Sequence, residues 1–262
     1  RDVLGSRGLG DVYKRQVKLQ GPSNVAAVAA YGASNLYTLT NDGEIYLYTC
    51  DWRTESCTGS KVTSFGDNNV QITSYNFYDY DYEDNFPRVY VLKADGTVMR
   101  YQDWSWSING ASNGYVTLSG ISNAKYIAAY NTSNLYVLTT DNNLMYYTCD
   151  WREESCTGSE VTNFGNDVIQ FSTYNYQEEG YEAQFPRIVV LKADGTVMRY
   201  QDWSWDISGA SNGYVPLSGI SNVKYVVAYN ASTVLAITND NKLMQYICNW
   251  QETSCTGSEI NY

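Results

Sequence analysis

The chain has 262 residues, of which 17% are charged and 15% are aromatic, and its formal net charge is −11 at pH 7. This acidic balance opposes binding to a phosphate backbone, so we expect no nucleic-acid partner. The absence of histidine excludes catalytic schemes of the Ser-His-Asp and Cys-His types. No run of 18 or more apolar residues occurs, and we therefore expect no membrane insertion.

The first 16 residues do not resemble part of a fold. Residues 6–16, SRGLGDVYKRQ, resemble one reading frame of the transposon-end adapter used to prepare sequencing libraries, and they lack the apolar core of a targeting signal. We interpret residues 1–16 as an adapter-derived artefact outside the structured domain. Residues 17–262 are then expected to be a fragment of a longer, metagenomic sequence.

From residue 17 onward the chain is a tandem repeat. Segment 119–151 matches segments 218–250 and 21–52, and a second kind of unit, PRVYVLKADGTVMRYQDWSW from Pro87, recurs from Pro186. We name the two kinds A and B; they alternate as A-B-A-B-A with a period of about 50 residues. The units run roughly over 17–68, 69–118, 119–167, 168–217 and 218–262.

Each unit predicts a small antiparallel sheet. The chain has 26 Tyr against 6 Phe, and Tyr, Thr, Val and Ile favour strands. Segments such as LYTLTNDGEIYLYTC indicate two alternating strands joined by a tight turn, with positive φ at Gly43 and, in the B units, at Gly96 and Gly195. A repeat of this kind is typical of a propeller blade, so we predict an all-β fold, a β-propeller with five readable blades.

The hairpin VYVLKADGTVMRY, followed by an Asp-Trp loop and a strand leading into the next unit, resembles the RCC1-like (regulator of chromosome condensation) repeats. Tectonin-type lectin repeats are similar over the same hairpin. The resemblance covers residues 17–262 and implies a β-propeller. The chain lacks the His before the hairpin and the Gly-Gln-Leu-Gly loop of the RCC1 pattern, which argues against a chromatin or nucleotide-exchange role.

The first readable segment indicates an incomplete ring. Residues 17–24, VKLQGPSN, match residues 116–123, VTLSGISN, which form the end of a B unit. We therefore expect that at least one B unit is missing upstream, and that the intact ring has six, seven or eight blades.

The cysteines occur only in the A units, as the pairs Cys50 and Cys57, Cys149 and Cys156, and Cys248 and Cys255. A zinc site needs four ligands, and a redox pair has a Cys-x-x-Cys spacing; neither pattern fits. We predict three local disulfides and no metal site. Disulfides imply an oxidising compartment, so we expect a secreted or surface-displayed protein.

Two features are candidate ligand-binding sites. In the Asp-Trp-Ser-Trp loops of the B units an aromatic face beside a carboxylate suits a sugar; the candidates are Asp103, Trp104, Trp106, Asp202, Trp203 and Trp205. The tyrosine-rich acidic insertions at 75–86 and about 175–185 provide Tyr78, Tyr80, Tyr82, Tyr176 and Tyr181. In the alternative interpretation the tryptophans pack between blades and the insertions are solvated loops.

The sequence thus predicts a non-enzymatic binding module that recognises a glycan or a protein through blade-edge loops, without a cofactor. No catalytic residue is assigned. Two alternatives stay open. One is a carbohydrate-active enzyme with a carboxylate pair in the central channel. The other is a structural or adhesive segment of a larger surface protein, since propellers serve many functions.

Overall fold

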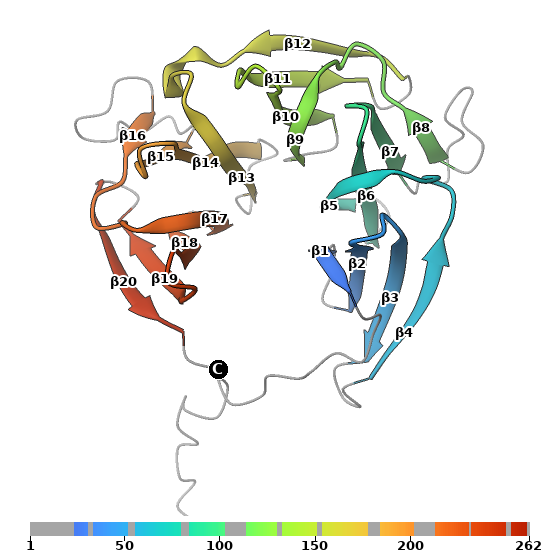
Figure 1. Cartoon of the computed structure of the whole chain (residues 1–262), viewed down its shortest axis with the longest axis horizontal. Helices are drawn as coiled ribbons and strands as arrows, with labels where there is room; N and C mark the ends of the chain where they lie inside the picture. Colours follow the sequence, from blue (N-terminus) through green and yellow to red (C-terminus); the bar gives the residue numbers. More distant parts are fainter. Residues whose placement is uncertain are drawn as a thin grey trace, which may run out of the picture.

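The computed structural model describes residues 24–30, 34–51, 56–79, 84–102, 114–129, 133–150, 154–177, 184–201, 213–230, 232–249 and 253–260. Within these ranges the chain forms five four-stranded antiparallel sheets. They are arranged around a central axis as the blades of a propeller, and each sheet runs from an inner strand near the axis to an outer strand (Figure 1). The predicted all-β propeller of five blades is confirmed.

Three sheets are formed by the A units. The first contains β1 (Val25–Ala30), β2 (Asn35–Thr40), β3 (Ile45–Asp51) and β4 (Ser56–Val62). The third contains β9 (Ala124–Ala129), β10 (Asn134–Thr139), β11 (Leu144–Cys149) and β12 (Cys156–Glu160), which the short 3-10 helix η3 (Thr162–Phe164) follows. The fifth contains β17 (Val223–Asn230), β18 (Thr233–Thr238), β19 (Leu243–Cys248) and β20 (Cys255–Glu259).

The B units form the second and fourth sheets, which alternate with the A sheets around the ring. The second contains β5 (Asn69–Asp79), β6 (Asp84–Lys93), β7 (Val98–Gln102) and β8 (Tyr115–Thr117). The fourth contains β13 (Val168–Gln177), β14 (Gln184–Lys192), β15 (Val197–Gln201) and β16 (Tyr214–Pro216). The two inner hairpins of the B sheets are the longest in the described part of the chain.

The turns between the second and third strands have the chemistry that the sequence predicts. Gly43, Gly96 and Gly195 have φ values of 78°, 84° and 86°. In the third and fifth sheets Asn142 and Asn241 take the same position, with φ values of 64° and 65°. Asparagine tolerates this left-handed conformation better than most residues, which explains why the A units can exchange Gly for Asn there.

Among the described residues the hydrophobic core is divided into four clusters, one between each pair of consecutive sheets. Leu39 and Phe65 belong to the cluster between the first and second sheets. Their equivalents 99 residues later, Leu138 and Phe164, fill the same place between the third and fourth sheets. Because each sheet buries apolar side chains against the sheet or sheets beside it, the stability of the fold depends on the contacts between blades.

Glutamine side chains join each B sheet to the A sheet that follows. Gln71 of β5 donates from Nε2 to the Ile127 carbonyl of β9 at 2.8 Å, and its Oε1 accepts from the Ile127 N–H at 2.8 Å. Gln170 of β13 makes the same pair of bonds with Val226 of β17, both at 2.9 Å. The inner strand is an edge of its sheet, so the amide takes the place of a neighbouring strand.

Hydroxyl groups join each B sheet to the A sheet that precedes it. Ser74 of β5 donates from Oγ to the Ala30 carbonyl at 2.7 Å. Thr173 of β13 donates from Oγ1 to the Ala129 carbonyl, also at 2.7 Å. Each inner B strand is therefore bonded on both sides, by its glutamine to the following A sheet and by its hydroxyl to the preceding one.

Candidate functional site

The five inner strands run in the same direction along the propeller axis. Gln170 is bonded to Val226 and Ser172 to Ala228, so the residue numbers of β13 and β17 increase together. Each sheet is antiparallel, so two of its connections leave from the same end of the propeller. These are the connection from the first strand to the second and the connection from the third strand to the fourth. We call this end the loop face; the turns at Gly43, Gly96 and Gly195 lie at the opposite end.

The B-unit Asp-Trp-Ser-Trp segments begin at the loop face. β7 ends at Gln102 and β15 ends at Gln201, directly before these segments. The candidate residues Asp103, Trp104, Trp106, Asp202, Trp203 and Trp205 themselves lie outside the described residues. Their direction and contacts therefore stay a prediction.

The tyrosine-rich insertions form hairpin arms at the same face. The third strand of this sheet, β7, ends at Gln102, which pairs with Arg88 of β6. Strands β5 and β6 continue to pair for four residues beyond Arg88, as far as the pair Asp79 and Asp84. At about 3.4 Å per residue the arm rises roughly 14 Å above β7. Strands β13 and β14 pair as far as Gln177 and Gln184 in the same way.

Only the backbone of these arms is described. Tyr78 lies on β5 and Tyr176 lies on β13, but their side chains are outside the described part of the structure. Tyr80, Tyr82 and Tyr181 lie outside it entirely. The role of these five tyrosines stays a prediction.

The three predicted disulfides are present. Each joins directly opposed residues of the third and outer strands of an A sheet, with a Cα–Cα distance of 4.0 Å: Cys50–Cys57, Cys149–Cys156 and Cys248–Cys255. The chain between the two cysteines of each pair is the A-unit Asp-Trp or Asn-Trp loop, which leaves from the loop face. The disulfide therefore fixes both ends of that loop.

The disulfide hairpin also binds the chain that arrives from the preceding B sheet. The Ser119 amide donates to the Glu154 carbonyl at 2.6 Å, and the Cys156 amide donates to the Ser119 carbonyl at 2.9 Å. Gly120 follows with φ of 86°, and a Cβ there would lie 2.2 Å from the Cys156 carbonyl oxygen. Only glycine fits this crossing, which recurs at Gly219.

Buried arginines from the B sheets support the A-unit loops. Arg100 of β7 donates from both Nη atoms to the Asp150 carbonyl at 3.1 Å each, and Arg199 of β15 donates from Nη2 to the Asn249 carbonyl at 3.3 Å. Asp150 and Asn249 directly precede Trp151 and Trp250. Sequence reasoning missed these positioning residues; the signal was the arginine repeated in the otherwise apolar hairpin VMRY.

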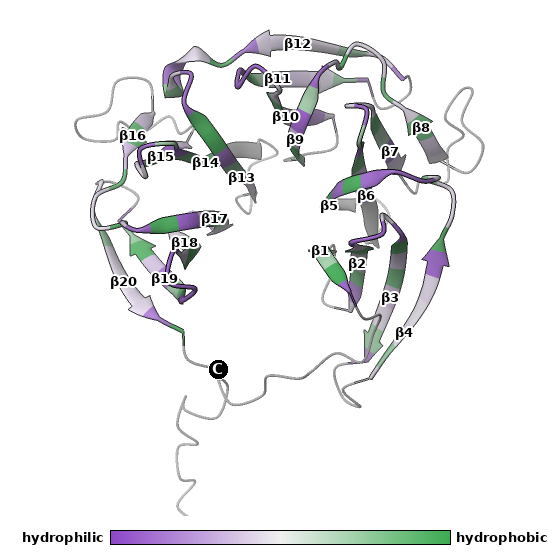
Figure 2. Cartoon of the chain, in the orientation of Figure 1, coloured by the Kyte–Doolittle hydropathy of each residue, from purple (hydrophilic) through white to green (hydrophobic). Residues whose placement is uncertain are grey.

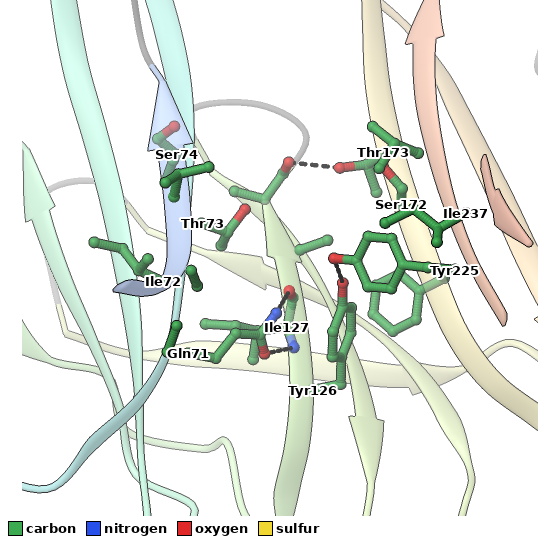
Figure 3. Close-up of a pocket in the computed structure, with 18 residues that line it drawn as sticks. Gln71, Ile72, Thr73, Ser74, Tyr126, Ile127, Ser172, Thr173, Tyr225 and Ile237 are labelled. Carbon is green, nitrogen blue, oxygen red and sulfur yellow. Dashed lines mark hydrogen bonds between the residues drawn. The ribbon is translucent and has the colours of Figure 1, made fainter. Parts of the chain in front are cut away.

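A central cavity of about 780 Å³ lies on the propeller axis between the inner strands (Figure 3). Its lining is mainly alanine, valine and isoleucine, with hydroxyls such as those of Ser74 and Thr173. The hydroxyls of Tyr126 and Tyr225 lie 3.3 Å apart. Burial raises the pKa of the Tyr126 phenol, and the neighbouring Tyr225 raises it further. None of the described residues that line the cavity is acidic, so they offer no carboxylate pair there.

No family model and no curated protein sequence matches the chain. Solved structures do match in fold. One is Prp20p from Saccharomyces cerevisiae, whose structure was studied with its binding to Gsp1p and histones. Its TM-score is 0.56 at 14% sequence identity, and the match covers 91% of this chain and 63% of the Prp20p chain. AofleA from Arthrobotrys oligospora has a TM-score of 0.58 and 14% identity over 90% of this chain and 71% of its own.

A third similar structure is the SapL1 lectin in complex with alpha methyl fucoside, with a TM-score of 0.56 and 13% identity over 88% of this chain and 77% of the lectin. The chain spans less than two thirds of the length of Prp20p and of human WBSCR16. At these identities the likeness concerns the fold. The fold expected from the resemblance to RCC1-like and tectonin-like repeats is confirmed: the chain is a β-propeller, similar to RCC1 and to propeller lectins.

Proposed function

We propose that this protein is a non-enzymatic binding module, secreted or displayed on a surface, that recognises a glycan or a protein through its loop face. The observation that carries the proposal is the convergence of the candidate segments. The Asp-Trp loops, the Asp-Trp-Ser-Trp loops and the tyrosine-rich arms all leave the sheets at this one end. Among the described residues the opposite end carries the tight turns between second and third strands and the short connections to the next sheet.

A glycan is the ligand that we favour. Tryptophan faces beside carboxylate or amide groups suit the apolar faces and hydroxyls of a sugar ring. The loops recur in successive blades, so a repeating ligand could be bound at several of them at once, with a gain in avidity. The three disulfides support export to an oxidising compartment, where extracellular glycans occur.

Glycan-array binding followed by calorimetry tests this proposal. We expect a saturable ligand, and we expect the double variant Trp104→Ala/Trp203→Ala to weaken its binding at least tenfold, roughly the effect of losing an aromatic anchor. Glu44→Gln is the matched control, because Glu44 is an exposed residue beside the turn at the opposite end. It should bind like the unaltered protein.

Two outcomes would overturn the proposal. Turnover of a bound glycan, abolished by replacing a carboxylate, would establish the enzyme instead. Equal binding by both variants would place the ligand away from the loop face. If the array is silent and a purified surface protein binds, loss of that binding in Tyr78→Ser/Tyr176→Ser would identify the protein ligand and keep the loop face as the site.

A further inference from the structure

The ring of sheets has an open side between the first and fifth sheets, both of which are A sheets. Consecutive sheets contact each other from β1 through β5, β9 and β13 to β17. Figure 1 shows these sheets around most of a circle, with the open side between β1 and β17. In Figure 2 both of these inner strands include hydrophobic stretches.

The two sheet faces that border the open side carry residues whose equivalents in the other A sheets are buried. Val28 of β1 is 61% exposed, whereas its equivalents Ile127 and Val226, which face a preceding B sheet, are 0% exposed. Val28 therefore occupies a position that a B sheet covers in the other two A sheets.

The same comparison holds on the other side of the opening. Ile237 of β18 is 37% exposed, whereas its equivalents Leu39 and Leu138, which face a following B sheet, are 1% and 0% exposed. Exposed aliphatic residues on both flanks of one opening indicate an interaction surface rather than scattered surface residues.

The hydrogen bonds between sheets identify the partner. In the third and fifth sheets, Ile127 and Val226 are hydrogen-bonded by a glutamine of the preceding B sheet. The equivalent residue of the first sheet is Val28. In the first and third sheets, the carbonyls of Ala30 and Ala129 accept a hydrogen bond from a hydroxyl of the following B sheet. The equivalent residue of the fifth sheet is Ala228. A single B sheet would serve both, because its inner strand carries both groups.

We propose that the open side accepts one further sheet of the B type, supplied by another copy of the same repeat within the polypeptide, which closes a ring of three A-B pairs. Its glutamine bridges the N–H and C=O of Val28, and its hydroxyl bonds the carbonyl of Ala228. The alternation requires an odd number of added sheets, which excludes a seven-bladed ring. A second copy of this chain does not fit, because its own open faces are both of the A type.

The test is a variant in which a copy of residues 168–214 replaces residues 1–16. The copy runs into Val17, the sequence equivalent of Val215, and completes a B unit ahead of the first A unit. We expect the Val28 amide to exchange with solvent at least about tenfold more slowly than in the unaltered chain. We also expect a rise in Tm of more than about 5 °C and a loss of bound hydrophobic dye.

Two controls separate a specific fit from mere added mass. The first carries Gln170→Ala within the copy and should lose the protection of Val28 while keeping the lower dye binding. The second carries a copy of the A-type residues 119–163 and should gain neither. Equal protection of Val28 in all three variants, or in none, would overturn the proposal.

If the amino-terminal copy does not fold, a second variant decides the matter. It carries residues 164–217 after Tyr262, the sequence equivalent of Asn163. Protection of Val28 and of the exposed face at Ile237 in this variant supports the proposal. A folded variant without that protection, or two variants that both fail to fold, contradicts it.

Discussion

At the residue scale, the contacts between blades depend on a few buried polar side chains. Gln170 is buried, and its amide satisfies both the N–H and the C=O of Val226. Gln71 does the same for Ile127. Without the amide these backbone groups have no strand beside them, and an unsatisfied buried group costs about 1 to 3 kcal/mol.

We predict that Gln170→Ala lowers the free energy of unfolding by roughly 2 to 4 kcal/mol, because it leaves two backbone groups unpaired and opens a small cavity. Chemical denaturation of the full chain measures this change. Gln245→Ala is a suitable control, since Gln245 lies in β19 and is not one of the glutamines that bridge sheets; it should change stability little. Equal effects of the two substitutions would contradict the assigned role of Gln170.

The Asp-Gly turns give a pH dependence. Asp95 accepts from the Thr97 amide at 2.9 Å and Asp194 from the Thr196 amide at 2.8 Å, and these backbone hydrogen bonds lower the pKa of both carboxyls. A carboxyl with a lowered folded pKa stabilises above its unfolded pKa of about 3.9, and this stabilisation is lost as the pH falls through the folded value.

We therefore predict that Tm falls as the pH drops below about 4, and that Asp95→Asn/Asp194→Asn makes this fall shallower. Asparagine can still accept from the amides but does not titrate in this range. Thermal melts between about pH 2 and 7 measure the effect. An unchanged slope in the double variant would mean that these turns do not contribute to the acid transition.

Some residues were predictable from the sequence and others were not. The positive φ at Gly96 follows from the Asp-Gly motif, because the turn type is a local property. The bridge from Gln71 to Ile127 joins residues 56 positions apart in different sheets, so no local pattern reports it. The signal that could have drawn attention to it is a glutamine in an apolar strand, repeated 99 residues later at Gln170.

At the element scale, the disulfide hairpin connects neighbouring blades as well as closing a loop. The bond Cys149–Cys156 holds the hairpin whose Cys156 amide binds Ser119 of the incoming chain. The hairpin also contains the Asp150 carbonyl that Arg100 holds. Opening the disulfide therefore releases both a loop at the loop face and a contact between sheets.

We predict that Cys149→Ser/Cys156→Ser lowers the free energy of unfolding by about 2 to 3 kcal/mol, the chain-entropy value for closing so short a loop. The loss of order should be greatest around Ser119, where hydrogen exchange should accelerate. The matched control, Cys50→Ser/Cys57→Ser, should leave exchange at Ser119 unchanged. Acceleration at Ser119 in both variants would contradict the local role.

The sequence predicted the strands and the disulfide pairs because both repeat every 99 residues with their spacing kept. No single motif predicts that the loops lie together at one end of the propeller. This arrangement follows only when four strands of each sheet are paired and the inner strands are found to run in the same direction.

At the scale of the whole molecule, one end of the propeller carries turns and the other carries the candidate binding segments. All seven tryptophans of the chain fall in sequence segments that connect strands at the loop face: Trp52, Trp104, Trp106, Trp151, Trp203, Trp205 and Trp250. We therefore expect tryptophan emission to respond to a ligand bound at that face. The central cavity, at the axis, contributes no tryptophan from its described lining.

The central claim is that the loop face binds the ligand, and tryptophan emission during titration with the glycan that gives the strongest array signal tests it most directly. We predict a saturable change in emission whose midpoint agrees with the Kd from calorimetry and moves to higher concentration in Trp104→Ala/Trp203→Ala. Saturable binding by calorimetry with no change in emission would contradict the claim and would place the ligand elsewhere on the propeller.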